Sequence, residues 1–350
     1  MRMRISAVLL TMCASLAWAS QPTGRWAQLD AQARDRFAAG QYSQALGPAR
    51  QALASAEKQA AGDQLSVLGS LDTLANIYAS LGRFDDAQPL FERALRLRED
   101  TFGNDGLSIA AALNNLGKLH DARNQFADAE RYYARALAIR ERTLGAHSPY
   151  VAENLNNLAL LYTAQGRYAE AEQGYARALG NFEQALGASD PAVASVLNNL
   201  GLLFEAQGRY AEAEPRYQRA LAIREQRFLG DHPDLSLSLN NLAGLYARQQ
   251  RYAEAEVLMR RTLAMDERLY GPAHPQVAAA LSNLAGLHAV QGGYGEAEPL
   301  LLRALAIREA ALDRRDPAIT MTLEDLRDLY RQAGREDRAA EIEQRLAKQV

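Results

Sequence analysis

The side chains of this chain that are most able to form specific hydrogen bonds recur at a fixed spacing. An Asn-Asn-Leu triplet returns every 42 residues, beginning at Asn114, Asn156, Asn198 and Asn240. Looser copies at 72–74, 282–284 and 324–326 keep the same register. Each asparagine amide offers two hydrogen-bond donors and an acceptor. A row of such amides can pair with the main chain of an extended segment, so the repeated chemistry is hydrogen bonding.

The five histidines are the natural candidates for a metal centre or a general base. His232 and His274 directly precede prolines, where other repeats carry Ser or Asp, and His147 lies one residue earlier in its own loop. His120 and His288 replace an aromatic residue of the repeat. A metal needs three or four ligands that converge on one point. Histidines one repeat apart do not provide this, so we predict no metal site.

The paired glutamates are equally poor candidates for catalysis. Glu170 with Glu172, and Glu212 with Glu214, recur within Tyr-Ala-Glu-Ala-Glu. Residues two apart on a helix point in different directions, and acidic residues in a first turn suit the positive end of the helix dipole. The sequence contains no phosphate-binding loop, nucleophile elbow or Cys/His dyad. We therefore predict a protein that is not an enzyme, with no catalytic residue and no cofactor.

The repeat itself predicts two helices. In the unit from 191 to 231, Asp190 can cap a helix that begins at Pro191, since proline has no N–H to lose there. An apolar stripe with helical spacing follows, and Gly208 provides a left-handed stop. A second apolar stripe begins at Tyr210 and extends to about Phe228.

A fixed period of this length is typical of a solenoid, in which each unit buries its apolar face against its neighbours. The predicted fold class is therefore all-α, a solenoid of about eight antiparallel helix pairs.

The first nineteen residues do not belong to the repeats. A basic start of Met1 to Arg4 precedes a largely apolar stretch, and Ala17-Trp18-Ala19 fits the small-x-small cleavage pattern. This predicts a signal peptide over 1–19 that is cleaved after Ala19, and hence export, most simply to the periplasm. One alternative is an uncleaved membrane anchor, although the apolar run is short for a membrane span. The other is lipidation at Cys13, although Met12 stands where an acylation site has a small residue.

The cysteine count and the net charge limit the kinds of ligand and partner that we expect. Cys13 is the only cysteine, so the mature chain has no disulfide and no thiolate metal site. Loss of Arg2 and Arg4 takes the formal charge from −3 to −5, which disfavours nucleic acid as a partner. No other stretch is long and apolar enough to span a membrane, so we predict no membrane span in the mature chain.

The chain resembles tetratricopeptide repeat (TPR) proteins. In the unit from 191 to 231 the family's pattern of small and large residues is matched by Leu197, Leu200, Gly201, Phe204, Gly208, Tyr210, Ala213, Tyr217 and Ala220. The 42-residue spacing, with Asp-His-Pro-Asp at 231–234 and Tyr-Ala-Glu-Ala-Glu at 252–256, is similar to the kinesin-light-chain and nephrocystin type.

The resemblance implies that the solenoid is a right-handed superhelix, and it also implies a domain organisation. Residues 20–61 read as a degenerate N-terminal capping pair, because Gln32 stands where the repeat has Leu. Tandem repeats then cover 62–334, and 335–350 form a C-terminal capping helix in which Glu336 and Glu343 replace aromatic residues. Terminal units of a solenoid need a polar outer face.

The resemblance also implies where a ligand binds. In TPR proteins the first helix of each pair lines a concave groove, and this maps onto the first Asn of each triplet, the residue one turn later and a flanking charge at Arg248. The predicted groove residues are Asn114, Lys118, Asn156, Leu160, Asn198, Leu202, Asn240 and Arg248. The alternative for the first Asn is inter-helix hydrogen bonding, and we interpret the second Asn of each triplet as a packing residue.

The function that follows is an exported, non-enzymatic scaffold that binds an extended peptide or a partner helix in the groove, with the partner's identity open. The alternative is a structural role in which the solenoid self-associates into a homo-oligomer.

Overall fold

The computed structural model describes residues 24–59 and 64–347. The predicted signal peptide at 1–19 lies outside the described residues. Sixteen α-helices account for all the regular secondary structure of the described ranges, which confirms the predicted fold class of paired helices. No helix within these ranges has the length and apolar character that a membrane span requires.

The chain divides into two compact units, residues 1–165 and 166–350. In the first unit the helices are α2 (Arg25–Ala38), α3 (Tyr42–Gln59), α4 (Gln64–Ser80), α5 (Phe84–Phe102), α6 (Leu107–Ala122), α7 (Phe126–Leu144) and α8 (Pro149–Ala164). In the second they are α9 (Tyr168–Leu186), α10 (Pro191–Ala206), α11 (Tyr210–Arg227), α12 (Pro233–Arg248), α13 (Tyr252–Tyr270), α14 (Pro275–Ala289), α15 (Tyr294–Ala311), α16 (Pro317–Gln332) and α17 (Glu336–Ala347).

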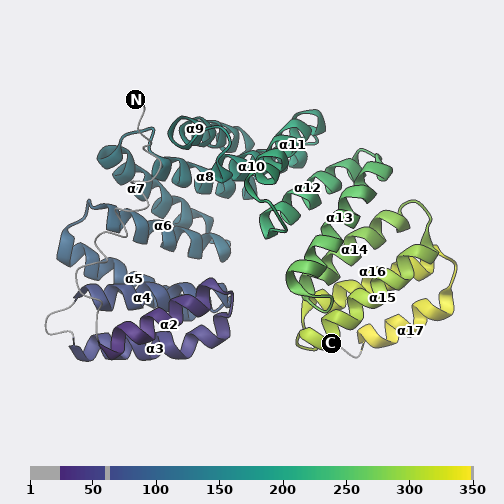
Figure 1. Ribbon diagram of the computed structural model, residues 1–350, viewed down its shortest axis with the longest axis horizontal. Coiled ribbons are helices and arrows are strands. Elements are labelled where there is room, and N and C mark those ends of the chain that lie inside the picture. Colours follow the sequence, from purple (N-terminus) through teal and green to yellow (C-terminus); the bar gives the residue numbers. More distant parts are fainter. Residues whose placement is uncertain (1–23, 60–63, 348–350) are drawn as a thin grey trace. The chain divides into compact units, whose positions relative to one another are not determined.

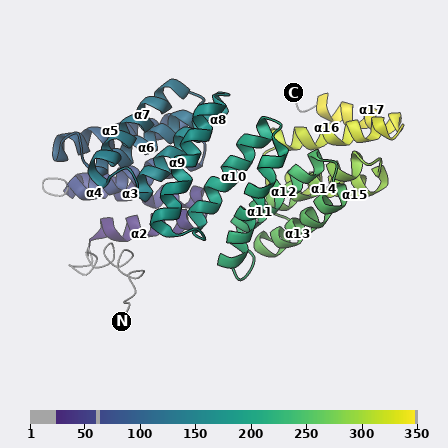
Figure 2. The ribbon, with the colours of Figure 1, turned by 90° about the horizontal axis from the view of Figure 1, so that it is seen from above.

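Within each unit, every helix packs on the next one in the chain (Figures 1 and 2). We call the first helix of each repeat the A helix (the even-numbered helices) and the second the B helix. In the second unit the A helices α10, α12, α14 and α16 alternate with the B helices α11, α13, α15 and α17.

The A helices α8, α10, α12, α14 and α16 begin where the sequence predicts, because the residue before each proline caps the helix. The Asp190 carboxylate accepts a hydrogen bond from the Ala192 N–H at 2.8 Å, and Asp316 caps α16 in the same way. His232 uses Nδ1 to accept from the Asp234 N–H at 3.1 Å. The pre-proline histidines therefore act as helix caps, with no metal-binding geometry around them.

The turn between the A and B helices needs a left-handed residue. Gly208 has φ of 72° at this position, as predicted. Its equivalents Asn124 and Gln250 hold φ of 58° and 63° without being glycine. Asparagine tolerates this region, whereas glutamine pays a steric cost for its Cβ there.

This cost predicts a stabilising substitution. Gln250→Gly should raise the free energy of unfolding by about 0.5–1 kcal/mol, because relief of left-handed strain exceeds the added freedom of the unfolded chain. The measurement is the thermal midpoint. Gly208→Ala is the mirror-image control, since a Cβ there meets nothing within 4 Å. It should destabilise through the backbone alone, and equal midpoints for all three proteins would contradict the argument.

The core places a small residue on the A helix against a large one on the B helix sixteen residues later. A Cβ built on Gly201 would lie 2.4 Å from Cε1 of Tyr217, and one on Gly117 would lie 2.6 Å from Tyr133. Both tyrosines are fully buried. The missing Cβ therefore lets the aromatic ring sit directly on the A-helix backbone.

Charged pairs also join successive B helices. Arg219 on α11 contacts Glu183 on α9 at 2.5 Å, and Arg261 and Arg303 contact Glu225 and Glu267 at 2.6 Å. The same 36-residue spacing joins Arg93 with Glu57, Arg135 with Glu99 and Arg345 with Glu309. Exposed pairs of this kind contribute little individually, but they fix which B-helix positions face each other.

The two ends of the described chain bury few side chains. Only Asp30 and Ala33 are buried on α2, and only Ala339 and Ile342 on α17. Helix α17 begins at Glu336, one residue after the predicted domain boundary. The capping role of these segments remains a prediction.

Candidate functional site

The asparagine triplets link successive A helices. The second Asn of one repeat donates a hydrogen bond to the first Asn of the preceding repeat. Asn157 Nδ2 donates to Asn114 Oδ1 at 2.9 Å in the first unit. In the second unit Asn241 donates to Asn198, and Asn283 donates to Asn240, both at 2.8 Å. The row of amides is therefore a hydrogen-bonded structure that holds its members in register.

This arrangement places the first Asn partly inside the protein. Asn114 and Asn198 are only 3% and 5% exposed, while Asn156 and Asn240 are half-buried. The inter-helix hydrogen bond occupies the oxygen of Asn114, Asn198 and Asn240. Asn114 Nδ2 is 3.5 Å from Glu153, whereas the described residues offer no acceptor to Nδ2 of Asn198 or Asn240. The oxygens of the amide row are thus engaged in contacts between repeats.

Lys118, Leu160 and Leu202 lie one turn further along the A helices, and Arg248 lies two turns beyond Asn240. Leu160 on α8 and Leu202 on α10 are exposed. Lys118 Nζ is 3.7 Å from Glu153, and Arg248 Nε is 2.6 Å from Glu205. The structure therefore places Asn114, Lys118, Asn156 and Leu160 on α6 and α8 of the first unit. It places Asn198, Leu202, Asn240 and Arg248 on α10 and α12 of the second.

The sequence reasoning missed three exposed apolar residues: Leu237 on α12, Val290 directly after α14 and Met321 on α16. Leu237 and Met321 stand at the repeat position held by Glu153 and Ser195. The signal available in the sequence was this change from polar to apolar at a position next to the amide row. Together with Leu202, they place one large apolar side chain open to solvent on, or directly after, each A helix of the second unit.

The second missed feature is a buried arginine that reaches from a B helix between two A helices. We call this space, between the A helices of successive repeats, the inter-repeat slot. Arginines fill it at one repeat position: Arg98, Arg140, Arg224 and Arg308. Arg140 donates to the Tyr150 carbonyl at 2.7 Å. Arg140, Arg224 and Arg308 therefore bind the first turn of the following A helix. Arg98 instead binds Asp72 on the preceding A helix.

Arg224 shows the arrangement in the second unit. It is 3% exposed and donates to the Asp234 carbonyl at 2.9 Å and to the Ser238 hydroxyl at 2.6 Å, both on α12. Ser195 on α10 lies 3.5 Å away on the other side. Burial lowers the pKa of Arg224, but an arginine remains protonated in proteins. The slot thus encloses a cation that is held mainly by neutral acceptors.

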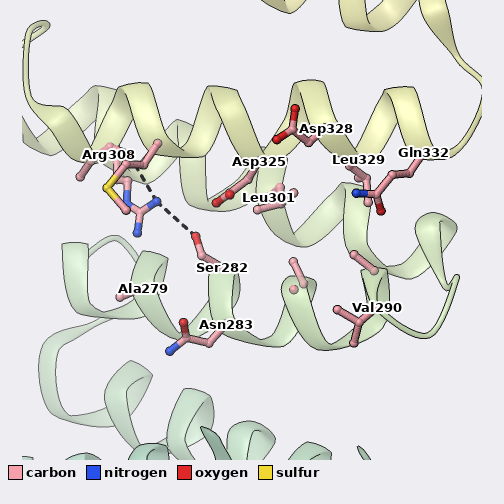
Figure 3. A pocket seen from close by; sticks show the side chains of 15 residues that line it. Ala279, Ser282, Asn283, Val290, Leu301, Arg308, Asp325, Asp328, Leu329 and Gln332 are labelled. Atoms are coloured by element: carbon pink, nitrogen blue, oxygen red, sulfur yellow. Dashed lines mark hydrogen bonds between the residues drawn. The ribbon is translucent and has the colours of Figure 1, made fainter. Parts of the chain in front are cut away.

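Arg308 fills the next arginine slot, between α14 and α16 (Figure 3). It donates to Ser282 on α14 at 3.2 Å and also to Thr322 on α16. Beside it lies a cavity of about 580 Å³. Its lining includes Asp325, Asp328 and Gln332 of α16, and Val290 directly after α14. This cavity is open on the A-helix face and combines a cation, carboxylates and apolar surface.

One slot of the second unit has no arginine. Asp266 on α13 stands at the arginine position, and it is 6% exposed. Its Oδ1 accepts a hydrogen bond from the Ser236 hydroxyl at 2.7 Å. A cavity of about 300 Å³ occupies the slot, and its lining includes Asn240, Thr262, Asp266, Tyr270, Gln276 and Ala280.

The buried carboxylate predicts a pH-dependent stability difference. Burial raises the pKa of Asp266, against the weaker lowering effects of the Ser236 hydroxyl and of His274. The folded chain then binds this proton more tightly than the unfolded chain, so the contribution to stability falls as pH rises from the unfolded to the folded pKa. Asp266→Asn should therefore stabilise the protein at pH 7, on the order of 1 kcal/mol.

Thermal midpoints at pH 7 and below about pH 4, where the aspartate is protonated in both states, test this. The gain should vanish at the lower pH. A variant that is less stable than the wild type at pH 7 would show that the contacts of the carboxylate outweigh its burial.

Within residues 24–59 and 64–347, no three His, Cys, Asp or Glu side chains gather in a geometry that could hold a metal. The glutamates of Tyr-Ala-Glu-Ala-Glu instead bind turn arginines. Arg251 contacts Glu254 of its own repeat at 2.6 Å and Glu214 of the preceding repeat at 2.8 Å. Arg209 likewise contacts Glu212 and Glu172.

The sequence matches the family model described as tetratricopeptide repeat over residues 66–142, 150–226, 234–310 and 276–348. The chain belongs to the tetratricopeptide repeat family. The matched segments cover most of the chain and follow the helix pairs of the structure. No curated protein matches the sequence.

Solved structures similar to this chain include kinesin-light-chain-like TPR proteins. BtubC (BKLC) from P. vanneervenii is 26% identical with a TM-score of 0.57, over 66% of this chain and 92% of that one. Nearly identical TPR-like repeats from a Podospora anserina protein named as a kinesin light chain are 23% identical with a TM-score of 0.50, over 58% and 95% of the two chains. The resemblance to kinesin-light-chain-like TPR proteins is thereby confirmed.

A third TPR structure matches most of this chain. A Rap protein complexed with competence and sporulation factor is 16% identical with a TM-score of 0.63, and the match covers 97% of this chain and 89% of that one. At this identity the match concerns the fold.

Proposed function

We propose that this TPR protein is an exported, non-enzymatic scaffold that binds an extended peptide segment of a partner along the exposed face of its A helices. The observation that carries the proposal is the amide row. Its oxygens are tied to the neighbouring repeat, and the Nδ2 groups of Asn198 and Asn240 have no acceptor among the described residues. Donors held at one repeat's spacing suit the carbonyls of an extended main chain.

Apolar contact lies beside these donors. Leu202 and Leu237 are exposed on α10 and α12, the helices that carry Asn198 and Asn240. A preformed surface of this kind reduces the ordering cost of binding. The solved complex of a Rap protein with competence and sporulation factor supports the use of this fold for ligand capture.

The export part of the proposal rests on residues 1–19, with their basic start and Ala-Trp-Ala end. Its test is the N-terminal sequence of the protein purified from a periplasmic fraction. A chain that begins at Ser20 supports export, and an intact Met1 in the cytoplasmic fraction contradicts it.

The groove test uses two matched double variants in the second unit. Asn198→Ala with Asn240→Ala removes the acceptors of two inter-repeat hydrogen bonds and also removes the two donors offered to a ligand. Asn241→Ala with Asn283→Ala removes the same two hydrogen bonds and leaves those donors in place. Each pair should lose about 1–3 kcal/mol of stability, since each hydrogen bond is worth about 1 kcal/mol.

Affinity capture from an extract of the source cells, quantified by mass spectrometry, then separates the roles. We expect a partner that the wild type and the Asn241/Asn283 pair retain, and that the Asn198/Asn240 pair loses by about tenfold, the effect of 1.4 kcal/mol. Equal capture by both double variants would show that the row is structural. Retention of nothing but further copies of the chain would favour the self-associating solenoid.

A further inference from the structure

The slot at Asp266 differs from its neighbours in a way that defines a ligand. In the slots on either side, Arg224 and Arg308 fill the space between the A helices. Their guanidinium groups bind side chains of the preceding A helix and the first turn of the following one. At Asp266 the guanidinium is missing, and an open cavity of about 300 Å³ remains. This is roughly ten times the share of volume of one water molecule, so a side chain can enter.

Some acceptors of the arginine slots remain in the empty one, whereas Ala280 stands where Ser238 and Thr322 supply a hydroxyl. Leu237 likewise replaces Ser195. The Gln276 main chain stands at the repeat position of Asp234 and Ala318, whose carbonyls accept from Arg224 and Arg308. Asn240 stands at the position of Ser282, which accepts from Arg308. Both residues line the cavity. The empty slot thus keeps part of the acceptor set of a guanidinium site, while the cation is absent.

The empty slot is also more negative than the filled ones. Asp266 is only 6% exposed, and it adds a carboxylate to the lining of the cavity. Ser236 donates to its Oδ1, and no described residue donates to its Oδ2. The other titratable groups at the slot are Asp234 and Tyr270, which line it, and His274, which lowers the pKa of Asp266. A buried carboxylate with an unpaired oxygen is costly unless a cation meets it.

We propose that this slot is a subsite for an arginine side chain of the bound partner, whose guanidinium takes the place that Arg224 and Arg308 occupy in the adjacent slots. Asp266 binds the guanidinium, and the Asn240 amide at the mouth of the cavity binds the main chain of the same segment. A planar guanidinium can donate to the carboxylate and to neighbouring carbonyls at once, which a lysine ammonium does less well. This inference rests on the proposed peptide-binding function. It adds that the A-helix face selects a partner segment that contains an arginine.

The test uses a defined probe and the full chain. N-acetyl-argininamide is titrated while amide chemical shifts are followed by TROSY NMR, with N-acetyl-citrullinamide as the neutral, near-isosteric control. We expect saturable shifts at Ser236, Asn240 and Ala280 with the arginine probe. The citrulline probe should bind at least about tenfold more weakly, as expected when a charge-assisted hydrogen bond becomes a neutral one.

Two variants confirm the location. Asp266→Asn keeps the shape and removes the charge, and should weaken the arginine probe by about tenfold or more. Asp266→Arg with Ala280→Ser rebuilds the Arg224–Ser238 pair within this slot, and should abolish binding because the chain's own guanidinium fills the cavity. The proposal is overturned if the citrulline probe binds the wild type as tightly as the arginine probe does. It is also overturned if the arginine probe binds Asp266→Asn as tightly as it binds the wild type. Neither result requires the Asp266→Arg variant to fold.

The result of the arginine-probe titration can be distinguished from the result of the groove test. Partner capture that depends on Asn198 and Asn240, together with no response to the arginine probe, overturns the arginine subsite and leaves the scaffold function standing. Saturable, Asp266-dependent binding of the probe supports the subsite even if the amide-row variants capture the partner as well as the wild type does.

Discussion

Replacing Arg224 by alanine is expected to lower the free energy of unfolding by about 2–4 kcal/mol, within the range of large truncations in protein cores. The side chain is 3% exposed and fills the slot between α10 and α12. Its removal leaves a cavity between two repeats and leaves Ser238, which is 1% exposed, without the donor at 2.6 Å. Both losses fall on the contact between repeats.

Arg227→Ala is the matched control, since Arg227 is an exposed arginine on the same helix. It should change stability by less than about 0.5 kcal/mol. Because repeat proteins unfold in segments, the measurement combines the thermal midpoint with hydrogen exchange across α10 to α12. A loss at Arg224 no larger than that at Arg227 would mean that the slot adds nothing to the cohesion of the repeats.

The second large effect is expected at Gly201. Gly201→Ala should destabilise by about 1–3 kcal/mol, the usual cost of overpacking, because the new methyl group would lie 2.4 Å from the Tyr217 ring. The chain itself limits the magnitude, since Ala159 precedes Tyr175 by the same sixteen residues. The fold can therefore accommodate an alanine at this position, and the variant should still fold.

Gly244→Ala provides a control of opposite sign. Gly244 lies within α12, and a Cβ there meets nothing within 4 Å. The helix propensity of alanine should then stabilise the protein by up to about 1 kcal/mol. Urea unfolding of both variants measures the difference. Destabilisation of similar size in both would rule out the contact with Tyr217 as the cause.

A companion substitution tests the pairing directly. Ala243 precedes Met259, and Ala285 precedes Leu301, so the chain pairs alanine with a flexible apolar residue in later repeats. Gly201→Ala combined with Tyr217→Met should be more stable than the sum of the single effects by about 1 kcal/mol or more, as contacting residues couple. Tyr217→Met alone also loses the 2.9 Å hydrogen bond from the tyrosine hydroxyl to Glu205.

The local elements of the fold could be predicted because each depends on a few neighbouring residues. A capping residue before proline, as at Asp190, starts a helix wherever it stands, and Gly208 ends one through its backbone. Because the pattern is repeated, one unit that departs from it does not change the predicted fold. Gln250 lacks the expected glycine, yet the turn forms there with the same left-handed backbone as at Gly208.

The contacts between repeats could not be predicted in the same way. Asn241 reaches Asn198, and Arg261 reaches Glu225, at separations of 43 and 36 residues. Neither separation equals the 42-residue period, because both depend on how far one helix is displaced along the next. The role of Arg224 was hidden for the same reason. Seen along its own helix it is one charge among several, and only the packing of α10 and α12 buries it.

The hydrogen bond between asparagines of adjacent repeats has a mechanical consequence. Asn240 accepts from Asn283 through its oxygen, and its nitrogen belongs to the same rigid, planar amide. If α14 slides against α12, this amide must turn with it, and the direction of its free donor changes. Under the proposed function, the position of α14 relative to α12 would therefore also set where the donor of Asn240 meets the main chain of a bound segment.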